Sequence, residues 1–180
     1  RERASYERML DSCVAAFGRT IVPVQLPIGS EKNLTGIIDI IKMKAFTYTM
    51  GGDGKGKEGE IPANMAEAAK AAHERFVEMV AEGDDTLMEE FFEKGTIDEE
   101  HLTAGLARLL DEDKIVPVLF ASGLGNIGVD RVMSFISEYM PDATHHHNVH
   151  GVPTAGNGTP PERKVADTEP PSAYVFKTAN

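Results

Sequence analysis

Residues 115–142 have a pattern typical of a strand, a tight loop and a helix, and this combination limits the possible folds. Residues 115–120 form a short, almost continuous apolar run, as expected for a strand covered on both faces. Residues 121–128 are small and include three glycines, which let the backbone turn sharply. We then predict a helix over 128–140, ended by Pro141, with one apolar face turned to the core: Val129, Val132, Met133, Ile136 and Met140.

Residues 121–128 are also a candidate ligand-binding loop. In open α/β sheets, ligands bind in loops at the carboxyl ends of the strands. An ordinary strand-to-helix connection without a ligand is the alternative, because glycine-rich loops of this kind are common.

The remaining periodicity predicts an α/β fold, a small mixed sheet with packed helices. Extended segments are expected over 21–28, 35–41, 43–49 and 115–120, and helices over 2–17, 64–82, 85–94, 98–110 and 128–140. The predicted caps are Gly18, Asn64, Asp84, Gly95 and Asp98. No apolar run approaches the ~20 residues of a membrane span.

Three blocks of sequence, in order along nearly the whole chain, resemble translation elongation factor G. Ser122, Gly123 and Leu124, followed by Asn126 and Gly128, are similar to the last guanine-binding motif of that family, which usually reads Gly-Ser-Ala and then Phe-Lys-Asn-Lys-Gly-Val. Residues 21–29 and 34–45 resemble the family's VPVQLPIG and TGVVDLVKMKA segments. Residues 167–177 resemble the start of its second domain.

This resemblance implies a domain organisation. Residues 1–20 would be a helix from the C-terminal half of the GTPase domain, and residues 21–114 a subdomain inserted in it. Residues 115–141 would be the last strand, loop and helix of the GTPase domain, and 142–171 an irregular linker. Residues 172–180 would begin a second, β-barrel domain, with 173–177 as its first strand. The chain opens on Arg1 rather than Met, so we expect a fragment of a longer protein.

The resemblance also implies a function. The parent protein is expected to be a cytoplasmic, ribosome-associated GTPase that uses GTP, GDP and Mg²⁺, with backbone N–H groups at Ser122, Gly123 and Leu124 meeting the guanine base. Gly123 stands where the family has Ala, and Gly125 and Ile127 stand where it has two lysines, which indicates a divergent paralogue. The P-loop, the switch segments and Asn-Lys-x-Asp are not in these 180 residues, so we expect no hydrolysis by this piece alone.

The charge pattern indicates a second, alternative role. The net charge is −11, and residues 52–113 alone carry 18 acidic and 6 basic side chains. A free-standing nucleic-acid binder would show the opposite sign. The resemblance points to docking of the ribosomal stalk protein's C-terminal domain, with Glu67, Glu74 and Glu78 as candidate contacts. An acidic binding module of a paralogue that recycles or protects ribosomes is the alternative function, and solubility alone is the plainest explanation of the charge.

Other suggestive residues favour ordinary structural explanations. Gly51, Gly56 and Lys57 fit GxxxxGK, but Glu58 stands where a P-loop needs Ser or Thr, so we predict a flexible, solvated loop. Cys13, the only cysteine, is expected to be a small, buried apolar residue on a helix. No metal site is expected, and the side chains considered are best explained by structure, solvation or adventitious metal binding: His73, His101, the carboxylates Glu89, Glu90, Glu93, Glu99 and Glu100, and the cluster His145, His146, His147 and His150.

Overall fold

The computed structural model describes residues 5–142, 144, 148–151, 162–170, 173 and 177–178, without the side chain of Arg19. The chain divides into two compact units, Arg1–Met140 and Pro141–Asn180, and each is described by itself.

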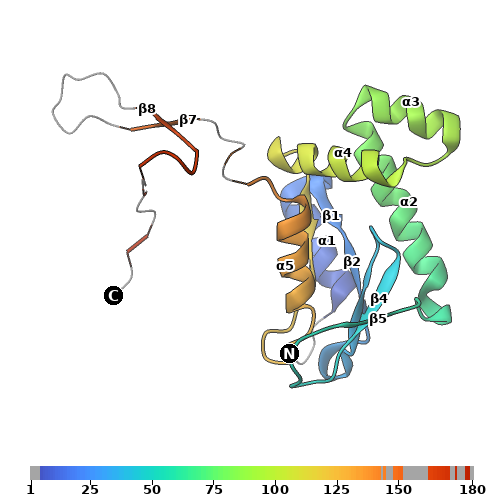
Figure 1. Cartoon of the computed structure of the whole chain (residues 1–180). Helices are drawn as coiled ribbons and strands as arrows, with labels where there is room; N and C mark the ends of the chain where they lie inside the picture. The colour runs from blue at the N-terminus through green and yellow to red at the C-terminus, as the bar shows by residue number, and fades with distance from the viewer. Residues whose placement is uncertain are drawn as a thin grey trace. The chain divides into compact units, whose positions relative to one another are not determined.

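Two sheets organise the first unit (Figure 1). β1 (Ile21–Pro23) pairs in parallel with β6 (Val116–Val118). An antiparallel meander follows, in the order β2 (Gln25–Ile28), β3 (Gly36–Asp39), β4 (Lys44–Thr47) and β5 (Lys57–Gly59). The predicted α/β class is therefore confirmed.

Val24 explains why the single extended segment predicted over 21–28 is divided between the two sheets. Its N–H donates to Val118 at 3.2 Å, and its carbonyl accepts from Ile40 at 3.2 Å. The chain thus passes from one sheet to the other at this residue. β5 is a strand that the sequence did not predict, because its glycine-rich surroundings carry no alternating apolar pattern.

Five α-helices lie in the described part of the chain, close to the predicted ranges: α1 (Tyr6–Phe17), α2 (Ala66–Glu82), α3 (Asp85–Lys94), α4 (Glu99–Asp111) and α5 (Val129–Tyr139). None of these helices combines the length and the apolar character that crossing a bilayer requires. Short 3₁₀ turns lie at Gly18–Thr20, Glu31–Asn33 and Ala63–Met65.

The structure confirms some of the predicted helix caps and contradicts others. Asp84 caps α3 by accepting hydrogen bonds from Thr86 and Leu87, and Gly95 ends the helix at φ 72°. The prediction of Asn64 as a cap is wrong, because the chain enters α2 through a 3₁₀ turn that contains Asn64. Asp98 sits at the start of α4, but its carboxylate makes no capping bond and binds Lys94 instead.

The core forms where α2 and α4 pack against the sheets. Predicted inward positions on α4 are all buried: Leu102, Leu106, Leu109 and Leu110. They meet Phe76, Val77 and Val80 of α2 and the β-branched residues of the strands. This burial is the main stabilising contribution of the unit.

The predicted apolar faces of α1 and α5 point outward instead. α5 buries Phe135 and Tyr139, while Met133 is 62% exposed and Ile136 49% exposed. On α1, Phe17 is 70% exposed and no described residue is buried. Helical periodicity identifies stripes of apolar residues, and α5 carries two such stripes. The spacing of residues alone does not show which of the two stripes meets the core.

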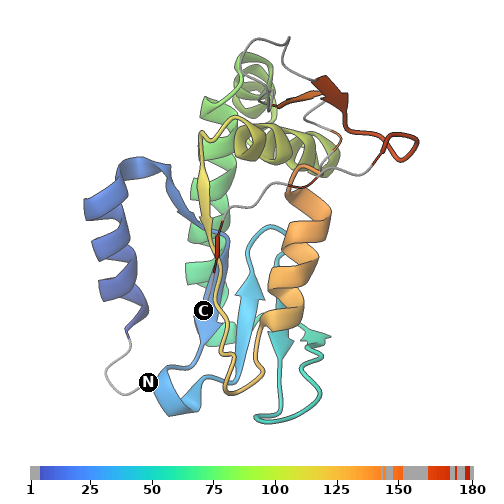
Figure 2. The same ribbon diagram turned by 90° about the vertical axis from the view of Figure 1, so that its left-hand side faces the viewer.

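The strand β6 is likewise less covered than predicted. Val116 is 48% exposed, and the other two residues of the strand are only half buried. Figure 2 shows α1 and α5 on opposite sides of the β1–β6 pair. The pair has only two strands in the described chain, so part of its surface has no neighbour.

The second unit contains a pair of strands that the sequence did not predict. β7 (Asn148–His150) and β8 (Glu162–Lys164) form an antiparallel pair with Val149 opposite Arg163, inside the segment predicted to be irregular. The predicted strand over 173–177 lies largely outside the described residues, as do His145, His146 and His147.

Candidate functional site

The loop after β6 closes on itself. Ser122 and Ile127 exchange two backbone hydrogen bonds, of 2.8 and 3.1 Å, and Ser122 Oγ accepts from the Gly125 N–H at 3.1 Å. Asn126 and Gly128 have positive φ, at 51° and 74°, and Gly128 directly precedes α5. The chain therefore reverses in a tight turn and enters the helix from it.

Gly123 and Leu124 form the tip of this loop. Leu124 is fully exposed, and no atom outside residues 122–124 lies within 4 Å of the position that a Cβ would take on Gly123. Within the described residues, the backbone N–H groups of Gly123 and Leu124 donate to no protein acceptor. Ser122 differs, because its N–H and hydroxyl are both used inside the loop. The tip thus offers two adjacent amide donors to an incoming group.

The glycine-rich loop before β5 supports this turn. Gly51 N–H donates to Gly125 O at 3.2 Å, and Asn126 Nδ2 donates to Gly52 O at 3.1 Å. Gly54 has φ 77°, and a Cβ there would lie 2.6 Å from the Asn126 amide. The loop is largely exposed to solvent, as predicted. Its predicted flexibility is not what the structure shows, since these bonds attach it to residues 122–128. A strand follows this loop rather than the helix that a P-loop requires.

A second attachment joins the segment between β4 and β5 to the start of α5. The Tyr48 hydroxyl donates to Asp130 Oδ1 at 2.6 Å, and the Gly56 N–H donates to Oδ2 at 3.0 Å. Burial and the hydrogen bond to this carboxylate raise the pKa of Tyr48. Burial acts to raise the pKa of Asp130 as well, but the Tyr48 and Gly56 hydrogen bonds and the Arg131 charge outweigh it and lower the pKa. The guanidinium of Arg131 also lies 4.4 Å from the centre of the Phe46 ring.

Gln25 fixes the other end of the loop. Its side chain is 2% exposed, and its Oε1 accepts the Phe120 N–H at 2.9 Å. The Phe120 ring packs on Tyr6 of α1 with centroids 5.0 Å apart. This buried amide therefore holds the last residue of the apolar run in place just before the turn.

The candidate docking residues lie on the outer side of α2. Glu67, Glu74 and Glu78 are all exposed. Lys70 pairs with Glu74 at 3.8 Å, so the face is acidic but not uniformly so. An exposed pair of this kind contributes little to stability, and these side chains are free to meet a partner.

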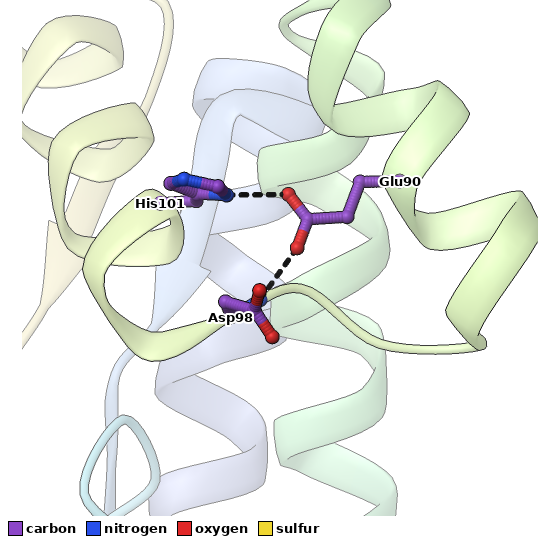
Figure 3. Close-up of side chains that lie close together, drawn as sticks. All are labelled: Glu90, Asp98 and His101. Atoms are coloured by element: carbon purple, nitrogen blue, oxygen red, sulfur yellow. Dashed lines mark hydrogen bonds and ion pairs between the residues drawn. The ribbon is translucent and has the colours of Figure 1, made fainter.

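The two helical histidines singled out in the sequence, His73 and His101, have different surroundings. His73 contacts the Ile40 carbonyl through Nδ1 at 2.7 Å, in agreement with the predicted structural role. His101 lies 2.6 Å from Glu90, whose side chain is only 11% exposed (Figure 3). Hydrogen bonds from His101, Lys94 and the Asp98 N–H lower the pKa of Glu90 to about 2, and Glu90 raises the pKa of His101. The description of Glu90 as merely solvated is therefore wrong.

Sequence reasoning missed three residues that position the loop: Gln25, Tyr48 and Asp130. A polar residue between two prolines in an apolar run is a usable signal for Gln25. Tyr48 and Asp130 are 82 residues apart and neither stands out in its own segment, so their contact has no local signature.

Comparison with known proteins supports the fold and does not assign a family. No protein-family model matches the chain. The crystal structure of ttk003000868 from Thermus thermophilus is similar, with 25% sequence identity and a TM-score of 0.72 over 83% of this chain. The chain spans 23% of that protein, so the similarity concerns one part of a longer molecule.

Proposed function

We propose that this chain is part of a cytoplasmic, ribosome-associated GTPase of the elongation factor G type. It would supply the last guanine-binding loop and an acidic insert that docks a protein partner. The observation that carries this proposal is the pair of unpartnered N–H groups at Gly123 and Leu124, held at the carboxyl end of a parallel strand.

Two adjacent amide donors suit guanine better than adenine. Guanine presents the O6 acceptor where adenine presents an N6 amino donor. Backbone N–H groups can donate to guanine O6, whereas the amino group of adenine offers them no acceptor. Small side chains are needed nearby so that the base can approach the backbone. The open space at Gly123 is compatible with that approach, and in this proposal the exposed Leu124 side chain would cover the base.

The uncovered apolar surface supports membership of a larger domain. Parallel sheets are normally buried on both faces, whereas the β1–β6 pair has an exposed Val116 and outward apolar side chains on α1 and α5. A groove of about 480 Å³ between α1 and α2 is lined mainly by apolar side chains. In this proposal the triphosphate and Mg²⁺ are held by residues outside this chain, and the parent acts in translocation.

The acidic insert supports the alternative function, an interaction module of a paralogue that recycles or protects ribosomes. In both cases the proposed partner is the stalk protein's C-terminal domain, and the proposed contact is the exposed face of α2. Charge of one sign raises the association rate with a basic or mixed protein surface and disfavours contact with rRNA.

The guanine proposal is tested in the longer protein that contains this chain. Gly123→Pro removes one amide donor, whereas Leu124→Ala keeps both donors and only shortens an exposed side chain. We expect Gly123→Pro to weaken GDP binding about tenfold, the equivalent of ~1.4 kcal/mol, and Leu124→Ala to have a smaller effect. Unchanged GDP affinity in Gly123→Pro, measured with a fluorescent analogue, would contradict the proposal.

The docking proposal is tested by charge reversal. The triple variant Glu67→Lys, Glu74→Lys and Glu78→Lys should slow stalk association and reduce ribosome-stimulated GTP hydrolysis, with unchanged nucleotide affinity. The control reverses three exposed acidic residues of α3: Asp85, Glu89 and Glu93. Equal effects of the two triple variants would indicate a general charge effect instead of a site on α2, and wild-type behaviour of both would leave solubility as the role of the charge.

A further inference from the structure

We propose that Glu90, Asp98 and His101 form a binding site for one divalent transition-metal ion, best matched by Zn²⁺, where α3 meets α4 (Figure 3). The three ligand atoms, one imidazole nitrogen and two carboxylate oxygens, lie within 4.8 Å of one another. A mixed nitrogen and carboxylate set of this kind suits Zn²⁺. The proposal is independent of the guanine and docking functions.

Glu90 is the fixed member of the site. Its side chain is 11% exposed, and it accepts the Asp98 N–H at 3.1 Å through Oε1, which leaves Oε2 directed at His101. Oε2 lies 2.6 Å from His101 Nδ1. A metal ion between them needs about 2.0–2.2 Å to each atom, which in tetrahedral geometry requires a separation of about 3.3 Å. His101 is 57% exposed and can move outward by this small amount.

Asp98 supplies the third ligand from the residue that precedes α4. Its side chain is 57% exposed and accepts no bond from the helix that it begins, so its carboxylate can turn toward the ion once Lys94 releases it. Three protein ligands leave one tetrahedral position for water. Because Glu90 belongs to α3 and the other two to the start of α4, the ion would join the two helices. The contact of Glu90 with the start of α4 joins two helices and has no local sequence signature.

The Lys94 side chain occupies part of the proposed site. Its Nζ lies 2.9 Å from Glu90 Oε1 and 2.6 Å from Asp98 Oδ2. The ammonium shows that the two carboxylates attract a cation, and it must leave before a metal ion can bind Asp98. The Lys94 side chain is 48% exposed, so it can move into solvent. Lys94 and the metal ion therefore compete for the same carboxylates. This competition distinguishes the proposal from a purely structural ion-pair network.

The test is calorimetric titration of the full chain with ZnCl₂. The starting variant replaces His145, His146, His147 and His150 by Ala, because that cluster can bind the metal by itself. We expect it to bind one Zn²⁺ per chain. His101→Ala in this background should weaken the affinity at least about tenfold, and Lys94→Met should increase it. Glu100→Gln, which removes an exposed carboxylate next to the site, is the matched control and should change the affinity less than about twofold.

Circular dichroism of each variant should match that of the starting variant, because His101, Lys94 and Glu100 are exposed. The proposal is overturned if the starting variant binds no Zn²⁺, or if His101→Ala binds as tightly as that variant. It is also overturned if Lys94→Met binds no more tightly, since the ammonium would then not occupy the metal position.

Discussion

The bond between Tyr48 and Asp130 offers a direct test of how the candidate loop is supported. Tyr48→Phe keeps the ring and removes only the hydroxyl, which donates to Asp130 at 2.6 Å. A hydrogen bond to a charged group contributes about 1.5–3 kcal/mol. Because the N–H groups of Gly56 and Arg131 still reach the carboxylate, we expect a loss near the lower end, about 1.5–2 kcal/mol. For a unit of this size that lowers Tm by about 5 °C.

The loss should depend on pH in a defined way. The pKa of Asp130 is lowered, so its contribution is present above the ordinary aspartate pKa and is lost as the pH falls through the folded value. The pKa of Tyr48 is raised, so its contribution is present below the ordinary tyrosine pKa and is lost as the pH rises. The difference in unfolding free energy between wild type and Tyr48→Phe is therefore largest between these two limits.

Urea unfolding at several pH values measures this difference. Tyr6→Phe is the matched control, because the Tyr6 hydroxyl makes no hydrogen bond within the described residues, and its loss should cost less than about 0.5 kcal/mol. A double-mutant cycle with Asp130→Asn isolates the pair. If Tyr48→Phe is as stable as Tyr6→Phe near neutral pH, the bond does not support the loop and the reasoning fails.

Three further predictions concern stability and are measured by urea unfolding. Gly54→Ala should lower the free energy of unfolding by about 1 kcal/mol more than Gly51→Ala. Both residues have positive φ, but only at Gly54 would the new methyl group press on a side chain, that of Asn126, and break its hydrogen bond to Gly52. Equal losses in the two variants would contradict this. Burial raises the pKa of Asp39, although its Oδ1 accepts hydrogen bonds from two backbone N–H groups. The side-chain oxygen of an asparagine can accept the same two hydrogen bonds. Asp39→Asn should therefore be more stable than wild type near neutral pH and lose that advantage as the pH falls to about 3. Leu106→Ala should cost about 2–5 kcal/mol, whereas Phe92→Ala, at a side chain 78% exposed, should cost less than about 0.5 kcal/mol.

Local patterns predicted the helices well because their causes are local. Asp84 and Gly95 bracket α3 as expected, since a cap needs only the N–H groups two and three residues on, or a residue that tolerates positive φ. The buried leucines of α4 follow from their spacing alone. Asn64 failed as a cap because a 3₁₀ turn, which has no clear sequence signal, precedes α2.

The candidate site was predicted only in part, because its supports come from distant segments. The position of the loop followed from an apolar run and glycines. Its attachment to the segment before β5 did not, since glycines predict turns and say nothing about what packs on them. The apolar faces of α1 and α5 were wrongly predicted to meet the core for a related reason. A stripe of apolar residues indicates that a face is buried, but it does not show which part of the protein covers that face.

The parallel pairing of β1 with β6 has a consequence for the order of folding. Gln25 and Phe120, which meet beside this pair, are 95 residues apart, and the entropy cost of closing a long segment delays such contacts relative to local ones. At about 5–20 residues per second, synthesis of the intervening chain takes about 5–20 s. The meander from β2 to β5 and the helices α2 to α4 have mainly local contacts and can form within that time. β1 meanwhile lacks its parallel partner, so we expect the enclosed segment to fold first and the strand pair to close around it last.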